Sequence, residues 1–379
     1  MKSNPFPTRF RAALVLFAVA LFVTTNLAAT EKVLHNFGSW PRDGKGPQGA
    51  LIFDSAGNLY GTTLGDWDCS QGCGTVFELT PHEGGHWTAK VLHYFRGDIG
   101  GSSDGACPRG NLIFDSAGNL YGTTAGGGVY GEGTVFEMTP RGDGTWIERV
   151  LHHFGQGEDG KYPPAGLIFD AAGNLYGMTS GGGVYGGGTV FEMTSEGDGT
   201  WTERVMHNFG ISETDGTSPS GSLIFDSAGN LYGTTGAGGY VTDTWPAGCG
   251  TVFELTPRGD GTWTERVLHF FGHGRDGVGP QSGLIFDSAG NLYGTTADGG
   301  EYNYEYGSGT AFELTPRGDG TWTENVLHFF GHGMDGMFPS GSLVFDAAGN
   351  LYGTTKQGGT HDACVNEENC GTVFEVTPN

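Results

Sequence analysis

A string of eleven residues recurs six times in this chain of 379 residues, and this internal repeat constrains the fold more than any other feature. The consensus is Leu-Ile-Phe-Asp-x-Ala-Gly-Asn-Leu-Tyr-Gly, and the copies begin at Leu51, Leu112, Leu167, Leu223, Leu284 and Leu343. Successive copies are therefore about 55–61 residues apart. A repeat of this length is typical of solenoids, propellers and linear arrays.

Each repeat unit contains four strand-like segments. In the fourth unit they are residues 221–225, 230–235, 251–256 and 263–271, and all four are rich in β-branched and aromatic residues. Several are apolar on both alternating faces, which indicates sheets buried on both sides, as in stacked propeller blades. The composition agrees, because 73 glycines and 12% aromatic residues suit short strands joined by tight turns.

The turns between these segments carry their own signals. The aspartate of each Asp-x-Ala-Gly-Asn turn is expected to accept a hydrogen bond from a backbone N–H two residues on. Gly-Asp-Gly-Thr is typical of the hairpin between the third and fourth strands. Arg-Gly-Asp begins at Arg96, Arg141, Arg258 and Arg317. Three of these copies lie in that hairpin, so a turn explains them better than cell adhesion.

The two ends of the repeat array complement each other. The fourth-strand signature Val-Leu/Met-His-x-Phe begins at Val33, Val91, Val150, Val205, Val267 and Val326. Its first copy precedes the first Leu-Ile-Phe-Asp, and the last unit stops after its third strand. We therefore expect the N-terminal strand to complete the last blade, which would close a ring and remove the exposed sheet edges.

The predicted fold is an all-β, six-bladed β-propeller with four antiparallel strands per blade, closed by the N-terminal strand. It occupies residues 30–379, after a secretory signal peptide at residues 1–29. The blades are expected at about 50–95, 110–154, 165–209, 221–271, 283–330, and 342–379 plus 31–37.

Three recurring segments of the repeat unit resemble those of a known family. They read Phe-Asp-Ser-Ala-Gly-Asn-Leu-Tyr-Gly-Thr-Thr, Gly-Thr-Val-Phe-Glu-Leu-Thr-Pro and Trp-Thr-Glu-Arg-Val-Leu. The unit resembles the GloVer tandem repeat of bacterial secreted proteins, and residues 280–293 are also similar to the NHL propeller repeat. The resemblance implies a propeller and export, and it implies no activity.

The N-terminus reads as an export signal. Basic residues precede an apolar stretch at residues 12–23, and the small residues Ala28 and Ala29 follow it. We expect a secreted, periplasmic or extracellular protein with no membrane span after cleavage. Retention of the segment as an anchor is the alternative. The net charge of −24 excludes a nucleic-acid partner, because no basic patch could follow a phosphate backbone.

Two residue types recur once per unit and invite a metal interpretation. The fourth-strand histidines are His35, His93, His152, His207, His269 and His328. We interpret them as structural, because zinc needs three or four ligands at one point. The Asp-Gly-x-x-Pro linkers contribute Asp43, Asp104, Asp159, Asp215, Asp276 and Asp335. Six carboxylates around a channel mouth could hold calcium, whereas a turn-forming role is the alternative. No other cofactor is expected. His273 and His332 in adjacent linkers are too few for a site of their own.

The loops between the second and third strands carry aromatic residues that point to a ligand surface. The candidates are Trp67, Tyr130, Tyr185, Tyr240, Trp245 and Tyr304. They should share one face with the linker aspartates. Flat aromatic faces beside carboxylates suit a carbohydrate or peptide ligand.

These candidate residues indicate a class of function but no specific ligand. We expect a monomeric, non-enzymatic binding or interaction module for a carbohydrate, peptide or protein ligand. No catalytic residue is assigned, because near-identical units offer few different groups that converge at one point. The alternative is a calcium-dependent hydrolase or lactonase that uses the channel face.

Six cysteines lie outside the strands, and disulfides are expected in an exported protein. We predict Cys69–Cys73 and Cys364–Cys370 as local bridges in equivalent loops. Cys107 and Cys249 belong to blades that are not neighbours. At least one free thiol is therefore expected, unless Cys107 pairs within the Cys69–Cys73 loop.

Overall fold

The computed structural model describes residues 32–38, 43–65, 69, 72–97, 103–301, 307–332, 335–359 and 371–378. The chain divides into two compact units, Met1–Leu34 and His35–Asn379. Several predictions lie outside the described residues: the signal peptide 1–29, Trp67, Tyr304, Cys364 and Cys370. No helix within the described part of the chain has the length and apolar character needed to span a membrane.

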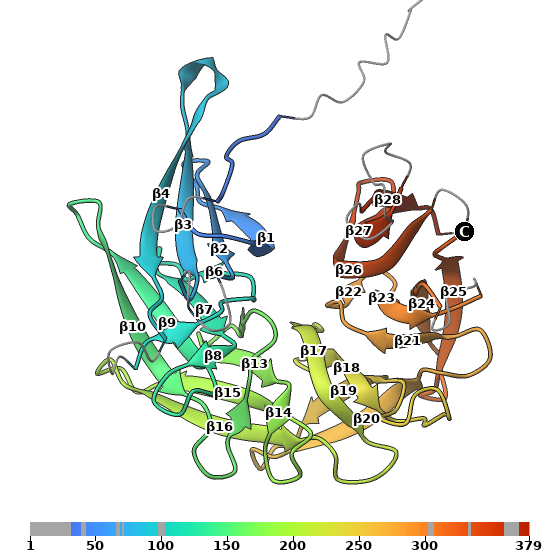
Figure 1. Ribbon diagram of the computed structural model, residues 1–379. Helices are drawn as coiled ribbons and strands as arrows, with labels where there is room; N and C mark the ends of the chain where they lie inside the picture. The colour runs from blue at the N-terminus through green and yellow to red at the C-terminus, as the bar shows by residue number, and fades with distance from the viewer. Residues whose placement is uncertain are drawn as a thin grey trace, which may run out of the picture. The chain divides into compact units, whose positions relative to one another are not determined.

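The unit His35–Asn379 is an all-β, six-bladed propeller, as predicted, and successive antiparallel sheets form its blades (Figure 1). Blade one is β1(Pro47–Phe53), β2(Leu59–Thr63), β3(Thr75–Pro81) and β4(Trp87–Tyr94), with a short 3-10 turn η1(Glu83–Gly85). Blade two is β5(Gly105–Ala106), β6(Ile113–Phe114), β7(Leu120–Thr124), β8(Gly126–Gly127), β9(Thr134–Pro140) and β10(Trp146–His153). Blade three is β11(Gly160–Lys161), β12(Ile168–Phe169), β13(Leu175–Thr179), β14(Gly181–Gly182), β15(Thr189–Ser195) and β16(Trp201–Asn208).

The remaining three blades repeat this order. Blade four is β17(Gly216–Phe225), β18(Leu231–Gly238), β19(Thr251–Pro257) and β20(Trp263–Phe270). Blade five is β21(Gly277–Pro280), β22(Ile285–Phe286), β23(Leu292–Gly299), β24(Thr310–Pro316) and β25(Trp322–Phe329). Blade six is β26(Gly336–Phe345), β27(Leu351–Gly358) and β28(Val373–Val376).

The hydrophobic core lies between adjacent blades. Phe95, at the end of the fourth strand of blade one, packs on Phe136 of blade two with 5.1 Å between ring centroids. Both rings are fully buried, and Leu112, Leu120 and Met138 join the same cluster. This packing explains why the strands are apolar on both faces: a sheet between two blades is covered on both sides.

The Asp-x-Ala-Gly-Asn turns are structural, as the sequence predicts. In blade two, Asp115 Oδ1 accepts hydrogen bonds from the backbone N–H groups of Ala117 and Asn119. Its second oxygen accepts the hydroxyl of Tyr121 at 3.2 Å. The Tyr121 hydroxyl oxygen also lies 2.8 Å from Glu137 Oε1, so its single proton is shared between the two carboxylates. The turn aspartate is thus fully occupied inside its own blade.

The Arg-Gly-Asp hairpins are structural as well. Asp143 Oδ1 accepts both the backbone N–H and the hydroxyl of Thr145, at 2.9 and 2.6 Å. The equivalent aspartates Asp198, Asp260 and Asp319 make the same pair of bonds. These carboxylates close hairpins, which confirms the turn interpretation.

The sixth blade differs from the prediction. Within the described residues its sheet has three strands, and β28 pairs with β27 alone. Residues 32–38 are described but belong to no strand. Val373 of β28 is consequently 79% exposed, whereas the equivalent Val76, Val135, Val190 and Val252 are fully buried. The expected closing strand is therefore not formed in this structure, and ring closure stays a prediction.

Candidate functional site

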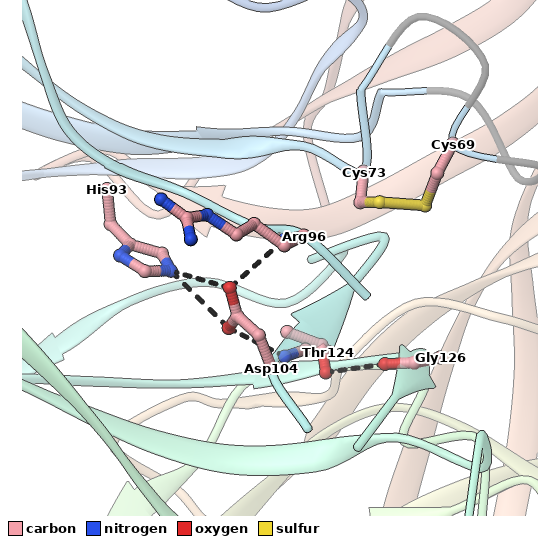
Figure 2. Close-up of a disulfide and its surroundings, with 8 residues drawn as sticks. Cys69, Cys73, His93, Arg96, Asp104, Thr124 and Gly126 are labelled. Atoms are coloured by element: carbon pink, nitrogen blue, oxygen red, sulfur yellow. Dashed lines mark hydrogen bonds and ion pairs between the residues drawn. A yellow bond between two sulfur atoms is a disulfide. The ribbon is translucent and has the colours of Figure 1, made fainter. Parts of the chain in front are cut away.

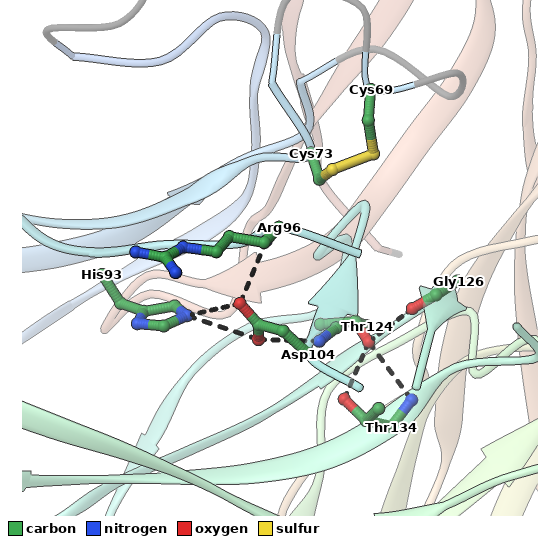
Figure 3. A network of polar contacts seen from close by, with 9 residues as sticks. Cys69, Cys73, His93, Arg96, Asp104, Thr124, Gly126 and Thr134 are labelled. Atoms are coloured by element: carbon green, nitrogen blue, oxygen red, sulfur yellow. Dashed lines mark hydrogen bonds and ion pairs between the residues drawn. A yellow bond between two sulfur atoms is a disulfide. The ribbon is translucent and has the colours of Figure 1, made fainter. Parts of the chain in front are cut away.

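The Asp-Gly pair of each linker lies against a pair of threonines, which is buried in blades one to five. In blade two, Thr124 and Thr134 are fully buried, and their hydroxyl oxygens lie 2.8 Å apart (Figure 3). A Cβ on Gly105 would lie 2.5 Å from the Thr124 methyl group, so only glycine fits. This close approach fixes the aspartate before the glycine in each unit.

Five of the six linker aspartates are held against the fourth-strand histidine of the preceding blade. Asp104 accepts the backbone N–H of Gly105 at 2.7 Å and that of Arg96 at 3.0 Å, and it lies 3.2 Å from His93 Nε2 (Figure 2). Equivalent contacts join His35 to Asp43, His152 to Asp159, His269 to Asp276, and His328 to Asp335, at 2.7–3.2 Å. The structure thus brings together the two sets of residues that the sequence presents separately.

Because the linker aspartates bind a histidine and a backbone N–H, they have a structural role that the calcium interpretation does not include. At four linkers one oxygen bonds the following glycine N–H while the other faces the histidine. Four of these histidines lie on fourth strands, each of which hydrogen-bonds only to the third strand of its sheet, so their pairs lie at the outer side of the blades. Five of the six histidines therefore bind a linker aspartate, which agrees with the structural interpretation, and His207 is the exception.

A glutamate from the next blade completes the group, and sequence reasoning missed it. Glu148 joins His93 and Asp104, Glu203 joins His152 and Asp159, and Glu265 joins His207 and Asp215; in each group, potential ligand atoms lie within 4.8 Å of one another. The glutamate is the third residue of Trp-x-Glu in the next fourth strand. The sequence shows that this glutamate recurs, but it does not show in which direction the side chain points.

The glutamates are buried without a full set of partners. One carboxylate oxygen of Glu148, Glu203, Glu265 and Glu324 is buried and accepts no hydrogen bond from the described residues. Burial, followed by the nearby linker aspartate, raises the pKa of each of the four from 4.5 to about 7. These carboxyls therefore keep their protons to a higher pH than exposed glutamates do.

A cavity opens at the first of these groups. It has a volume of about 660 Å³, and its lining includes His93, Asp104, Glu148, Arg96 and Arg149. Both acidic and basic groups face it, so it suits a small polar ligand better than an apolar one.

The predicted aromatic residues divide into exposed and packed ones. Tyr130, Tyr185 and Tyr240 are 45%, 51% and 43% exposed, respectively. Each lies against a linker glycine: the positions where Gly155, Gly210 and Gly272 would carry a Cβ are 3.1–3.6 Å from Tyr130, Tyr185 and Tyr240. These loops therefore share one face with the linkers, as predicted.

Two other candidates pack rather than project. Trp245 is half-buried against the cluster that includes Cys249 and Phe271. His273 stacks on Tyr240 with 3.9 Å between ring centroids, so it supports that ring. Trp67 and Tyr304 lie outside the described residues.

One predicted disulfide is present. Cys69 and Cys73 are bonded, with 4.5 Å between their Cα atoms, in the loop beside Gly97 (Figure 2). Cys249 is a buried free thiol, which confirms that at least one cysteine stays reduced. Cys107 is buried and outside the disulfide, and its backbone N–H donates to the carbonyl of Cys73 at 2.7 Å.

Solved structures with the same architecture include enzymes of several kinds. An α-L-arabinanase of Penicillium chrysogenum, solved with arabinobiose, has 13% identity and a TM-score of 0.49, over 89% of this chain and 94% of its own. A glucose dehydrogenase has 15% identity and a TM-score of 0.48, over 88% and 97%. An ulvan lyase of polysaccharide lyase family 25 has 12% identity and a TM-score of 0.51, over 82% and 78%. At 12% identity and a TM-score of 0.51, the likeness to the lyase concerns the fold alone.

Sequence comparison is more specific. No curated protein matches the chain. The family model of the Gloeobacter/Verrucomicrobia repeat matches it three times, over residues 20–154, 67–244 and 239–379. These matches cover nearly the whole chain and the same units that form the blades, so the protein belongs to the Gloeobacter/Verrucomicrobia repeat family.

Proposed function

We propose that this protein is a non-catalytic binding module, and that the loop face of blades two to four takes a carbohydrate or peptide ligand. The observation that carries the proposal is the repeated exposure of an aromatic residue with an aliphatic neighbour. Val129 and Tyr130, Val184 and Tyr185, and Tyr240 and Val241 are all between 43% and 58% exposed.

The tyrosines are suited to ligand contact because they are held in place. The Cβ atoms of Tyr130 and Tyr185 lie beside linker glycines, and the Tyr240 ring lies beside Gly272 and stacks on His273. A fixed ring loses little side-chain entropy on binding, and tyrosine combines a broad apolar face with a polar tip. A sugar ring can stack its C–H face on such a platform, and a peptide can place an apolar side chain there.

The linker and loop groups near these rings provide polar contacts. Lys161 pairs with Glu132 at 2.9 Å beside the Tyr130 loop, and Tyr162 in the same linker is also exposed. Repetition of the platform on three successive blades favours an extended ligand that contacts several sites at once.

The proposal includes export, which rests on the basic and apolar pattern of residues 1–29. An exported binding module would meet polysaccharides and peptides outside the cytoplasm. The hydrolase alternative gains no support from the described residues, because the three candidate metal groups there use fourth-strand glutamates rather than inner-strand groups.

A binding screen against a glycan array and a peptide library, with and without calcium, tests the function. The variant Tyr130→Ala/Tyr185→Ala/Tyr240→Ala should weaken binding of any ligand found by at least about tenfold, because each lost aromatic contact removes about 0.5–1.5 kcal/mol. Ile147→Ala is the matched control, since Ile147 is exposed on the outer strand β10.

Equal affinity of the triple variant and the wild type would place the ligand elsewhere and contradict the proposed surface. Turnover of a bound glycan or lactone by the wild type would contradict the non-catalytic assignment.

A further inference from the structure

The interface between blades three and four differs from the others in how its histidine and aspartate are bonded. At the preceding interface His152 Nε2 lies 2.9 Å from Asp159, and at the following interface the histidine and aspartate, His269 and Asp276, are also 2.9 Å apart. Asp215 is instead turned toward the backbone, where its Oδ2 accepts the N–H groups of Gly210 and Ile211 at 2.7 and 2.9 Å.

With Asp215 turned in this way, three buried ligand atoms without partners meet at one place. His207 Nε2, Asp215 Oδ1 and Glu265 Oε1 have no hydrogen-bond partner among the residues that the structure describes. Asp215 is only 4% exposed, so water does not satisfy it from outside. Potential ligand atoms of the three residues lie within 4.8 Å of one another.

The surroundings hold these side chains in position. The His207 ring packs edge-on against Phe209, 4.6 Å between centroids, and the two backbone bonds fix the Asp215 carboxylate. Such outer contacts commonly orient the ligands of a metal ion. His207 comes from β16, Glu265 comes from β20, and Asp215 comes from the linker between β16 and β17.

We infer that His207, Asp215 and Glu265 bind a divalent transition-metal ion of the zinc type and thereby join blades three and four. One imidazole nitrogen and two carboxylate oxygens form a donor set that zinc accepts, with a fourth position left for water or a ligand. Calcium fits less well, because it prefers six to eight oxygen ligands and no imidazole. Two carboxylates in a buried site also match the charge of a divalent cation.

The atoms need only a modest approach to close around an ion. Ligands at about 2.0–2.2 Å from a tetrahedral zinc lie about 3.4 Å from one another. Rotation of the Glu265 and His207 side chains can supply the difference from 4.8 Å. Because the ion would bind the folded chain alone, the melting temperature should rise with the logarithm of the free ion concentration once that concentration exceeds the Kd.

The chain provides its own controls. Blade one carries Ala89 at the position of Glu265, as the pairing of Ala89 with Leu79 and of Glu265 with Leu255 shows, so the fold accepts Glu265→Ala. Glu203→Ala removes the same glutamate at the interface where His152 and Asp159 bond each other.

The test uses untagged, chelator-treated full-length protein titrated with Zn²⁺, followed by calorimetry and melting temperature, and with Co²⁺ by visible absorption. We expect one high-affinity site, a higher melting temperature and a cobalt spectrum of low coordination number. Glu265→Ala and Asp215→Asn should each weaken binding at least about tenfold, whereas Glu203→Ala should leave it unchanged.

Three outcomes would overturn the inference: no zinc binding by the wild type, equal binding by Glu265→Ala and Asp215→Asn, or equal loss in Glu203→Ala. A response to Ca²⁺ but not to Zn²⁺ or Co²⁺ would also overturn it. In the first case the buried oxygens would share a proton rather than a metal.

Discussion

Phe37 packs its ring against Phe77 of blade one, with 4.8 Å between the ring centroids. The same contact joins the fourth-strand phenylalanine of each blade to the third strand of the next, in the pairs Phe95–Phe136, Phe154–Phe191, Phe209–Phe253, Phe271–Phe312 and Phe330–Phe374. His35 likewise contacts Asp43 as the other fourth-strand histidines contact their linkers. Residues 35–37 thus already contact blade one as a fourth strand of blade six would.

A second set of contacts is incomplete at the same junction. A tyrosine of each blade packs edge-on against a phenylalanine of the next, in the pairs Tyr60–Phe114, Tyr121–Phe169, Tyr176–Phe225, Tyr232–Phe286 and Tyr293–Phe345. The equivalent Phe53 of blade one is 66% exposed. Its expected partner by the same repeat is Tyr352 of blade six.

The first prediction is that residues 30–37 pair with β28 and close the ring. The register of β24 with β25, in which Glu313 lies opposite Asn325, places Lys32 opposite Glu375. Lys32→Cys/Glu375→Cys should therefore form a disulfide, because directly opposed strand residues bring their Cα atoms within bonding range.

Peptide mapping without reduction identifies this bridge. Lys32→Cys/Glu313→Cys is the matched control, since Glu313 already faces Asn325. Bridges of equal yield in both variants, or none in the first, would contradict closure by this segment.

The sequence predicts the blades well because their signals are local. Alternating apolar residues, the Asp115 turn and the Gly-Asp-Gly-Thr hairpin each act within a few residues, and six copies repeat them. The linker aspartates and fourth-strand histidines were also visible as recurring residues. Their mutual contact was not, because it depends on how one blade packs on the next.

The glutamate that the sequence analysis did not connect to this group shows the physical limit of prediction from a sequence pattern. Glu148 and His152 are four residues apart in one strand and would share a face of a regular strand. A bulge at Leu151 shifts the register, since Val150 faces Phe136 while His152 faces Val135. The bulge turns Glu148 to the preceding blade and His152 to the following one. A pattern of period two does not reveal such a shift.

The second prediction concerns strain in the linkers. Ser218 precedes Pro219 with a φ of 55°, and the exposed Ser218 side chain gains nothing from this conformation. Its N–H donates to the carbonyl of Gly187 in the preceding blade at 2.8 Å, which holds it there. Ser218→Gly should stabilise the protein by up to about 1 kcal/mol, because relief of the left-handed strain exceeds the added freedom of the unfolded chain.

The reciprocal change is the control for that prediction. Gly279 occupies the equivalent position with a φ of 64°, and a Cβ there would meet no atom closer than 3.7 Å. Gly279→Ser should therefore cost about 1–2 kcal/mol through the backbone alone. Urea unfolding of both variants measures the two effects, and shifts of the same sign would refute the strain argument.

The third prediction is a pH dependence of stability at the His93–Asp104–Glu148 group. Burial and the Asp104 carboxylate raise the pKa of Glu148 from 4.5 to about 7, while His93 opposes the shift. The folded state therefore holds the Glu148 proton more tightly than the unfolded state, and this group's contribution to stability falls as pH rises from about 4.5 to about 7.

Glu148→Gln removes that ionisation. The variant should match the wild type below about pH 4.5 and melt at a higher temperature above about pH 7. Glu137→Gln is the control with the opposite sign, because Glu137 pairs with Arg149 at 2.6 Å and loses that bond. A constant difference between Glu148→Gln and the wild type across pH 4–8 would exclude a raised pKa.

The fourth prediction concerns the cysteines. Cys69 and Cys73 are four positions apart, so their bridge closes a small ring. Its removal by Cys69→Ser/Cys73→Ser should cost less than the roughly 3 kcal/mol expected for a fifteen-residue loop.

Cys249 is buried, so it should react with an alkylating reagent only after unfolding. Non-reducing peptide mapping should recover a Cys69–Cys73 peptide and a Cys364–Cys370 peptide. Recovery of Cys73–Cys107 or Cys107–Cys249 in their place would show that the loops pair across blades instead of locally.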